Sequence, residues 1–239
     1  MKATGNMYED VGQTWNPLAG KCLHQCKYCS TNKLMRFPVI REKYSGNIRL
    51  DEKQLNRKFD NKEETIFVVA QNDLFAENVP EEFILKILAR CDNPFKTYFF
   101  QSKNPTRMIE FADRFPEKTI LCTTIESSSI FVNWERLYNC NIGVDLFGSY
   151  TRFNAFKHEL LQQFDKQITI EPIIKFSKKF AKEFENIPNL KQVNIGANTY
   201  KKVQLPEPTR DEILNLIAHL ETFTVVKQKS NLTRLTRGR

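Results

Sequence analysis

Short apolar segments alternate with amphipathic segments from residue 65 onward. The apolar segments predict strands at residues 65–70, 96–101, 118–125, 167–171 and 191–195, and weaker patterns at 7–13 and 222–227 allow a first and a last strand. The segments between them predict helices at 80–91, 105–114, 134–138, 149–164, 177–185 and 210–220. Near-continuous apolar strands that alternate with helices are typical of a parallel sheet covered by helices.

The region before this alternation is less regular. The sequence predicts a short helix at 30–36 that ends at Pro38, and a helix at 52–59 with Asp51 as its N-cap. No internal repeat and no flexible linker is evident. We therefore expect one domain over residues 1–225, followed by a basic tail over 226–239.

Polar residues follow each predicted strand on its carboxyl side. They are Gln71-Asn72-Asp73, Gln101-Ser102-Lys103, Thr123 to Ser127, Glu171, and Gly196 with Ala197 and Asn198. One such residue is more often a cap or a turn than a ligand, but five successive groups favour a shared site, because parallel strands of a barrel end on one face. Since the chain is short for a closed barrel, we expect an α/β fold with a partial parallel β/α barrel of about six strands, open on one side.

Composition and charge limit the class of protein. The 41% of apolar residues suffices for a core, while the longest apolar runs are far shorter than the roughly 20 residues that span a bilayer. We predict a cytoplasmic protein without membrane contact. The formal charge of +8 is compatible with a solvated tail or with attraction to nucleotides and nucleic acid, because the excess of cations is high near the C-terminus.

Three thiols fall within eight residues, at Cys22, Cys26 and Cys29. Three thiolates can bind three metal positions of a cubane and leave the fourth without a protein ligand, and an open position allows a metal site to activate a substrate. The spacing therefore suggests catalysis more than structural support. The remaining cysteines, Cys91, Cys122 and Cys140, are scattered singly and are expected to be buried apolar residues.

The Cys-x3-Cys-x2-Cys spacing, with the aromatic Tyr28 before the last cysteine, resembles the motif of the radical S-adenosylmethionine (SAM) superfamily. The resemblance implies that the cysteines hold a 4Fe-4S cluster and that SAM binds its fourth iron. It further implies that an electron from a flavodoxin-like or ferredoxin-like donor leads to reductive cleavage of SAM and a 5'-deoxyadenosyl radical. The cofactor would supply this chemistry, and the protein would orient and shield it.

A narrower resemblance rests on Trp15-Asn16-Pro17, Asn72-Asp73-Leu74-Phe75 with Val79-Pro80, Ser102-Lys103-Asn104-Pro105 and Ile170-Glu171-Pro172. These segments are similar to successive motifs of a phage-associated radical-SAM-like family of uncharacterised function, over most of residues 14–200. The family commonly has a longer spacing between its first two cysteines. Here the spacing is that of the wider superfamily, which favours the cluster and weakens the transfer of detailed function.

The resemblance and the residue chemistry together suggest individual roles. The predicted set is Cys22, Cys26 and Cys29 as metal ligands; Tyr28, Gln71, Asn72, Asp73, Thr124, Glu126 and Gly196 as cofactor-binding residues; and Lys103 and Glu171 as catalytic residues. Tyr28 and Gly196 would approach the adenine, Gln71 to Asp73 would receive the methionyl ammonium, and Thr124 and Glu126 would contact the ribose or the carboxylate. Alternatively, Tyr28 packs, Gly196 makes a turn and Lys103 is solvated, and His24 is expected to be an exposed spacer.

The sequence leaves two functions open. The first is a radical SAM enzyme that acts on an unidentified substrate, with a nucleotide or nucleic acid as the leading class. The second is a non-catalytic nucleic-acid-binding protein in which Cys22, Cys26, Cys29 and His24 or a distant residue hold one zinc ion. A methyltransferase is disfavoured because no glycine-rich loop follows the strand at 65–70.

Overall fold

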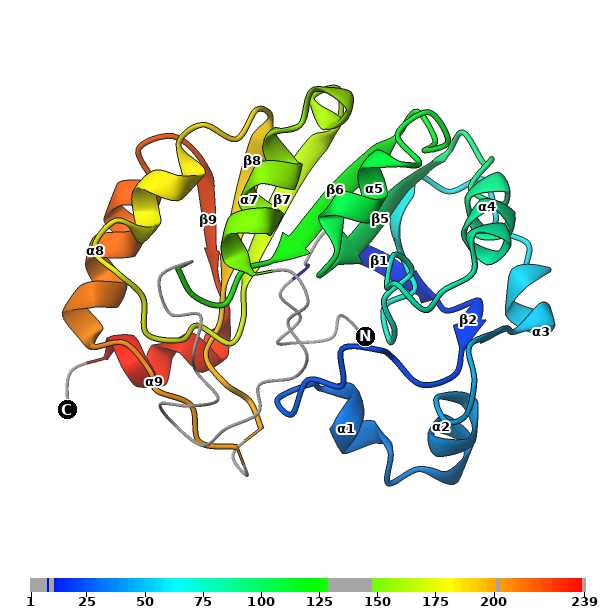
Figure 1. Ribbon diagram of the computed structural model, residues 1–239, viewed down its shortest axis with the longest axis horizontal. Coiled ribbons are helices and arrows are strands. Elements are labelled where there is room, and N and C mark those ends of the chain that lie inside the picture. The colour runs from blue at the N-terminus through cyan, green and yellow to red at the C-terminus, as the bar shows by residue number, and fades with distance from the viewer. Residues whose placement is uncertain (1–7, 9–10, 129–147, 201–202, 238–239) are drawn as a thin grey trace.

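Seven parallel strands follow one another in chain order across one curved sheet. The computed structural model describes residues 8, 11–128, 148–200 and 203–237, and the statements below concern these residues. The sheet order is β1-β4-β5-β6-β7-β8-β9, and all six strand pairs are parallel. The bounds are Val11–Trp15 (β1), Glu64–Val68 (β4), Lys96–Ser102 (β5), Thr119–Thr124 (β6), Asp165–Ile170 (β7), Leu190–Ile195 (β8) and Val225–Gln228 (β9). The sheet bends into a partial barrel (Figure 1).

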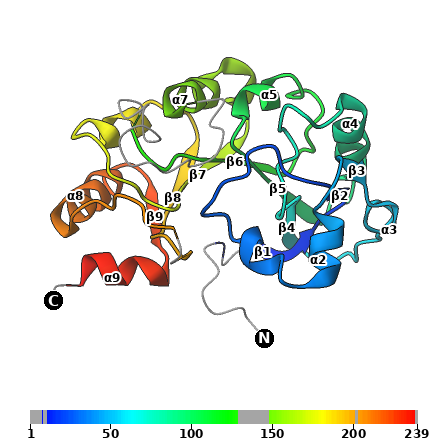
Figure 2. The same ribbon diagram turned by 60° about the horizontal axis from the view of Figure 1, so that its bottom comes forward.

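Helices cover the outer, convex face of this sheet (Figure 2). They are α4 (Glu81–Ala89), α5 (Pro105–Ile109), α7 (Ser149–Lys157) and α8 (Arg210–Leu220), with the 3-10 turns η1 (Glu159–Leu161) and η2 (Phe180–Phe184) between them. In α4 the periodic residues Ile84, Ile87 and Leu88 are buried, as are Ile66 and Val68 on the neighbouring strand β4. The apolar face of α4 packs against the apolar face of the sheet, which is why the helix has a helical period of apolar residues and the strand is apolar.

Most predicted elements after residue 64 are confirmed. Helix α8 spans the predicted 210–220, and Thr209 and Glu212 form a reciprocal capping box at its start. The predicted helix at 177–185 is instead the shorter 3-10 turn η2. The predicted helix at 134–138 and Cys140 lie outside the described residues, whereas Cys91 and Cys122 are buried as expected.

The N-terminal region departs from the prediction at Pro38. Helix α1 (Thr31–Leu34) ends earlier than expected, and Pro38 begins a second helix, α2 (Pro38–Lys43), instead of ending the first. Proline is compatible with the first turn of a helix, because the N–H that it lacks would have no partner there. The two ends of this segment pair as a two-stranded antiparallel sheet of β2 (Leu18–Ala19) and β3 (Arg49–Leu50). The next helix, α3 (Glu52–Leu55), is capped by Asp51 as predicted.

The C-terminal region is more ordered than a solvated tail. Strand β9 pairs with β8, so the expected domain boundary at 225/226 falls inside the sheet. The turn η3 (Ser230–Leu232) and helix α9 (Thr233–Thr236) follow, and Leu232 is fully buried. Three apolar residues of this segment, Val226, Leu232 and Leu235, contact the core, which accounts for its order. That the chain forms a single domain stays a prediction.

The α/β partial barrel is confirmed, with seven strands in place of about six. Both weak patterns, at 7–13 and 222–227, correspond to edge strands, although β1 begins and ends a few residues later than predicted. In the described part of the chain, no helix combines the length and the apolarity that crossing a membrane requires.

Candidate active site

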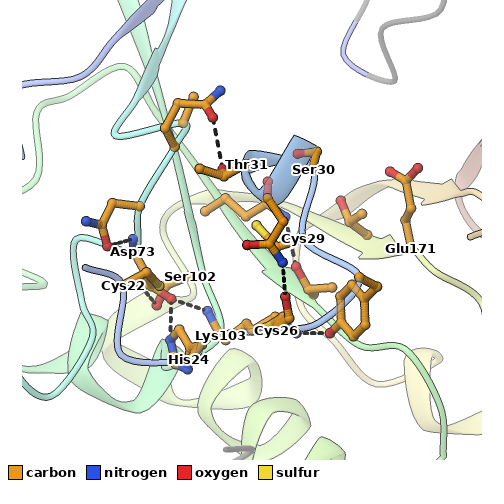
Figure 3. A pocket seen from close by; sticks show the side chains of 18 of the residues that line it. Cys22, His24, Cys26, Cys29, Ser30, Thr31, Asp73, Ser102, Lys103 and Glu171 are labelled. Carbon is orange, nitrogen blue, oxygen red and sulfur yellow. Dashed lines mark hydrogen bonds and ion pairs between the residues drawn. The ribbon is translucent and has the colours of Figure 1, made fainter. Parts of the chain in front are cut away.

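The carboxyl ends of the strands and the cysteine-containing segment enclose a cavity of about 600 Å³. Its walls come from the cysteine loop (residues 20–30), from α1, and from residues that follow β4, β5, β7, β8 and β9. Figure 3 shows Cys22, Cys26 and Cys29 on one side of this space and Glu171 on another. The volume lies within the 300–1,000 Å³ that is usual for small-molecule and cofactor sites.

The cysteine loop presents all three motif thiols to the cavity. Cys22, Cys26 and Cys29 are half-buried free cysteines. Gln25 adopts a left-handed conformation with φ of 44°, and the Cys29 N–H donates to the Cys26 carbonyl at 3.0 Å. The side chain of Asn32, in α1, donates to the same carbonyl at 3.0 Å. This turn brings the three sulfur-bearing positions back toward one space.

The thiols lie in an environment that opposes their ionisation. Burial, and next the charge of Asp73, raises the pKa of Cys22 to about 12. Burial also raises the pKa of Cys26, against the opposing influence of Lys103. A bound metal ion deprotonates a coordinating thiol outright, so a cationic cluster would overcome this environment.

His24 is buried, and the expectation of an exposed spacer is wrong. The residue is 4% exposed, and its Nε2 lies 2.8 Å from Oδ2 of Asp73. Its Nδ1 is also buried and has no hydrogen-bond partner among the described residues. Asp73 follows β4, so this pair ties the cysteine loop to the end of the sheet.

The Asp73 carboxylate is surrounded by hydrogen-bond donors. Oδ1 accepts from the Ser102 hydroxyl at 2.6 Å and from the Phe75 N–H at 3.0 Å, and Oδ2 accepts from the Lys103 N–H at 2.8 Å in addition to His24. Burial opposes ionisation, but the bond from His24 and these further donors hold the pKa of Asp73 below its usual value. The ionised carboxylate therefore holds the cysteine loop, β4 and β5 together.

Gln71 and Asn72, which follow β4, bind α1 and the first residue of the cysteine loop. The Thr31 hydroxyl donates to Gln71 Oε1 at 2.9 Å, and the Asn72 amide donates to the Gly20 carbonyl at 3.0 Å. Both side chains also line the cavity. Val69, just before them, has a φ of 56°, which is strained for a β-branched residue and turns the chain sharply after β4.

A buried network of charges lies beneath Cys26. One Glu126 oxygen accepts from the Tyr28 hydroxyl and from Lys103 Nζ, and the other accepts from Arg152 Nη1 at 2.9 Å. Burial opposes ionisation of Glu126, but Lys103 and Arg152 lower its pKa to about 2. Against its own burial, Lys103 has a raised pKa because of the nearby Cys26 and Glu126. Two cations thus share one carboxylate next to the cysteine loop.

The floor of the cavity is polar as well. The Gln101 amide donates to the Thr124 hydroxyl at 2.8 Å, and the Tyr8 hydroxyl donates to Gln101 Oε1 at 2.7 Å and lies 2.8 Å from the Thr169 hydroxyl. The Tyr8 ring packs against Phe67 and Phe99 inside the curved sheet. A bound molecule would therefore meet hydroxyl and amide groups at the bottom of the site.

Glu171 projects into the cavity from the end of β7 and is paired. Lys229 Nζ, which follows β9, lies 2.7 Å from Glu171 Oε1. Gly196 packs on the same side chain, because a Cβ there would lie 2.9 Å from the Glu171 carboxyl carbon. The contact of Gly196 in this structure is thus with Glu171, and its predicted approach to an adenine stays a prediction.

A family model named "Protein of unknown function (DUF5131)" matches residues 7–146 of this sequence. The chain belongs to the DUF5131 family. None of the curated proteins compared with the sequence matches it. The phage-associated family stays a prediction.

The DUF5131 chain is similar in fold to solved structures of spore photoproduct lyase. A variant of that protein with dinucleoside spore photoproduct superposes with a TM-score of 0.57 at 14% identity, covering 88% of this chain and 75% of that one. A second complex with the same dinucleoside has the same TM-score of 0.57 and the same coverage of 88% and 75%, at 13% identity. At this identity the similarity shows a common fold.

The residues of this DUF5131 protein fit a cluster with three cysteine ligands. The three free thiols line one cavity, as the three protein ligands of such a cluster must. Among the described residues, no three His, Cys, Asp or Glu side chains converge as ligands of one metal ion. A cubane cluster does not require the three cysteines to converge on one metal ion, because each cysteine binds a different iron atom.

Ten of the twelve predicted site residues of the DUF5131 chain line the cavity, and the exceptions are Glu126, directly beneath it, and Gly196. Their individual roles stay predictions. Sequence reasoning gave no role in the cofactor or substrate site to His24, Arg152 or Lys229, and it named Ser102 only as one of the polar residues after a strand. His24 carried a signal, since it lies inside the cysteine motif, whereas Arg152 and Lys229 reach the site only through the curvature of the sheet.

Proposed function

We propose that this protein is a radical SAM enzyme that acts on a nucleotide or nucleic acid. The observation that carries the proposal is the placement of Cys22, Cys26 and Cys29 on the wall of the cavity at the carboxyl ends of a parallel partial barrel. The motif spacing and the fold shared with spore photoproduct lyase, a radical SAM enzyme, support it independently. Cys22, Cys26 and Cys29 would hold a 4Fe-4S cluster.

A reduced cluster held by Cys22, Cys26 and Cys29 would supply the electron for cleavage of SAM to methionine and a 5'-deoxyadenosyl radical. The His24–Asp73 contact and the hydrogen bonds of Gln71 and Asn72 hold the cysteine loop and α1 in place. These contacts attach the cysteine loop and α1 to the segment after β4, and Asp73 also binds Ser102 and Lys103 at the end of β5, which favours a fixed geometry at the reacting centre.

The cavity also supplies groups that suit the polar parts of SAM. The side chains of Gln71 and Asn72 are near the cysteine loop and can receive an ammonium group, while the Lys103 ammonium can donate to a carboxylate. The Tyr28 ring, which packs beside the Lys103 ammonium at 5.0 Å, offers an aromatic surface next to the last cysteine. We assign these residues to the cofactor and the Thr124 hydroxyl to its ribose.

Glu171 and Lys229 are on the side of the cavity that β7 and β9 form, and we assign them to the substrate. A nucleotide is supported by the ammonium group of Lys229, by the net charge of +8, and by the dinucleoside bound to spore photoproduct lyase. A flavodoxin-like or ferredoxin-like protein would deliver the electron.

The proposal is tested by anaerobic reconstitution with iron and sulfide. We expect about four irons per chain, and formation of 5'-deoxyadenosine from SAM under dithionite. Cys26→Ala should lose the cluster and the cleavage, because the cluster would lack one of three protein ligands. Cys91→Ala is the matched control, since Cys91 is a buried cysteine away from the cavity and should retain both.

Two results would contradict the proposal. Protein purified without oxygen could contain one tightly bound zinc and no reconstituted iron, which would favour the non-catalytic zinc protein. Alternatively, Cys26→Ala and wild type could form the same small amount of 5'-deoxyadenosine, which would show that the motif does not hold the reactive group.

A further inference from the structure

We infer that the outer side of the cysteine loop, together with α1 and α2, is the docking surface for a small acidic electron-transfer protein that carries a flavin or an iron–sulfur cluster. The inference rests on the proposed function, because it assumes a redox centre at the cysteines. We call this surface, formed by residues 21–49 on the outside of the loop, the α1–α2 surface.

Residues 21–49 are one of the strongly basic segments of the chain. Residues 21–49 contain the single acid Glu42 and seven cations, which gives a net charge of 7 − 1 = +6; the cations are Lys21, Lys27, Lys33, Arg36, Arg41, Lys43 and Arg49. Six of the seven cations are exposed, and Lys43 is half-buried against Asp51. A surface of this sign attracts an acidic partner and hastens their encounter.

Exposed apolar side chains lie among these cations. Phe37 is 47% and Val39 is 76% exposed, and α2 has no buried residue. Figure 1 shows α1 and α2 projecting from the sheet. Apolar groups that are exposed together within a polar rim are typical of protein–protein contacts, whereas phosphate binding requires no such groups. This feature favours a protein partner over nucleic acid.

The cysteine loop at the edge of the α1–α2 surface also borders the main cavity. A second hollow of about 380 Å³ lies on the outer side of the loop and is lined by Leu23, Asn47, Ile48 and Asn78, among others. Lys21, Cys22 and Gln25 line both hollows, so the loop is their common wall. A carrier seated outside would meet one ligand of the proposed cluster without entering the space kept for SAM and substrate.

The electron balance of this step is simple. One electron would leave the reduced carrier, for example a flavin hydroquinone that becomes the semiquinone, and would reduce a cluster held by Cys22, Cys26 and Cys29 by one electron. No bond to the substrate forms or breaks at this surface. The partner must therefore present its cofactor close to its own acidic face.

The test compares Arg36→Glu/Arg41→Glu with Lys178→Glu/Lys182→Glu. All four side chains are exposed, and the two double variants have the same net charge, but the second pair lies near η2. A purified flavodoxin is the probe. Its dissociation constant is measured by fluorescence anisotropy, and 5'-deoxyadenosine formation is measured with flavodoxin hydroquinone and, separately, with dithionite.

We expect Arg36→Glu/Arg41→Glu to weaken flavodoxin binding and to slow the flavodoxin-driven reaction by about tenfold at low salt, with an unchanged dithionite-driven rate. The difference should shrink at 0.5 M salt, where the screening length falls to about 4 Å. Lys178→Glu/Lys182→Glu should resemble the wild type in both assays.

Three outcomes would overturn the inference: equal effects of the two double variants, no change in flavodoxin affinity, or a loss of binding to a single-stranded oligonucleotide with flavodoxin binding intact. The last outcome would assign the surface to nucleic acid. Failure of the proposed function is recognised separately, because wild type would then form no 5'-deoxyadenosine even with dithionite. The affinity measurement still decides the docking question in that case.

Discussion

Replacement of Glu126 by glutamine removes a carboxylate that pairs with both Lys103 and Arg152. Both cations are largely buried, with side-chain exposures of 16% and 1%, and Glu126 itself is 9% exposed. The glutamine amide retains the shape of the side chain but not its charge. Lys103 and Arg152 would then lose the negative charge that both contact in a poorly solvated region, which is costly.

The size of the effect follows from the pKa of Glu126, which falls from 4.5 to about 2 on folding. At about 1.36 kcal/mol for each pKa unit, the ionised carboxylate contributes about 3 kcal/mol at neutral pH. This value agrees with the roughly 3–5 kcal/mol that is lost when one partner of a buried ion pair is removed. We therefore expect Glu126→Gln to lower the free energy of unfolding by about 3 kcal/mol at pH 7.

The pH dependence has a defined sign. Because the folded-state pKa is depressed, the stabilisation is complete above the unfolded value of 4.5 and is lost as the pH falls toward 2. At pH 3 the difference between wild type and Glu126→Gln should be about half of its value at pH 7.

The assay is urea unfolding of the metal-free protein, followed by circular dichroism, at pH values from 3 to 7. Glu110→Gln is the control, because Glu110 is an exposed carboxylate at the end of α5, and it should change stability by less than about 0.5 kcal/mol. Lys103→Met combined with Glu126→Gln should be less destabilised than the sum of the single variants. Additive effects, or a loss below about 1 kcal/mol, would refute the shared-carboxylate argument.

Two further predictions concern the attachment of the site to the sheet. Asp73→Asn should lower the free energy of unfolding in urea by about 2–3 kcal/mol, because the new amide N–H₂ would face the donors from His24 and Lys103 or those from Ser102 and Phe75. The control Asp113→Asn, at an exposed position, should change stability little. Equal effects of the two substitutions would contradict the role of the buried carboxylate. Gly196→Ala should lose about 1 kcal/mol through contact with Glu171, and this loss should be smaller in a Glu171→Ala background; an unchanged loss there would exclude that contact as its cause.

The sequence by itself determined the class of the fold and most of the cavity lining. Apolar strands that alternate with amphipathic helices leave few arrangements other than a parallel sheet with helices outside, so the carboxyl ends had to meet on one face. This rule places Gln71, Lys103, Thr124 and Glu171 around one space, as observed. The local signals at Asp51 and Thr209 were equally dependable, because a cap acts within one helical turn.

Only the tertiary structure decided which side chains pair across that space. His24 became a buried partner of Asp73, and Lys229 became the partner of Glu171 over a separation of 58 residues. Such pairs depend on how far the sheet bends and on which edge the last strand joins, and no local pattern records either. The C-terminal cations looked like a solvated tail for the same reason. Pairing of β9 with β8 is a long-range contact, and it alone brings Lys229 to the cavity.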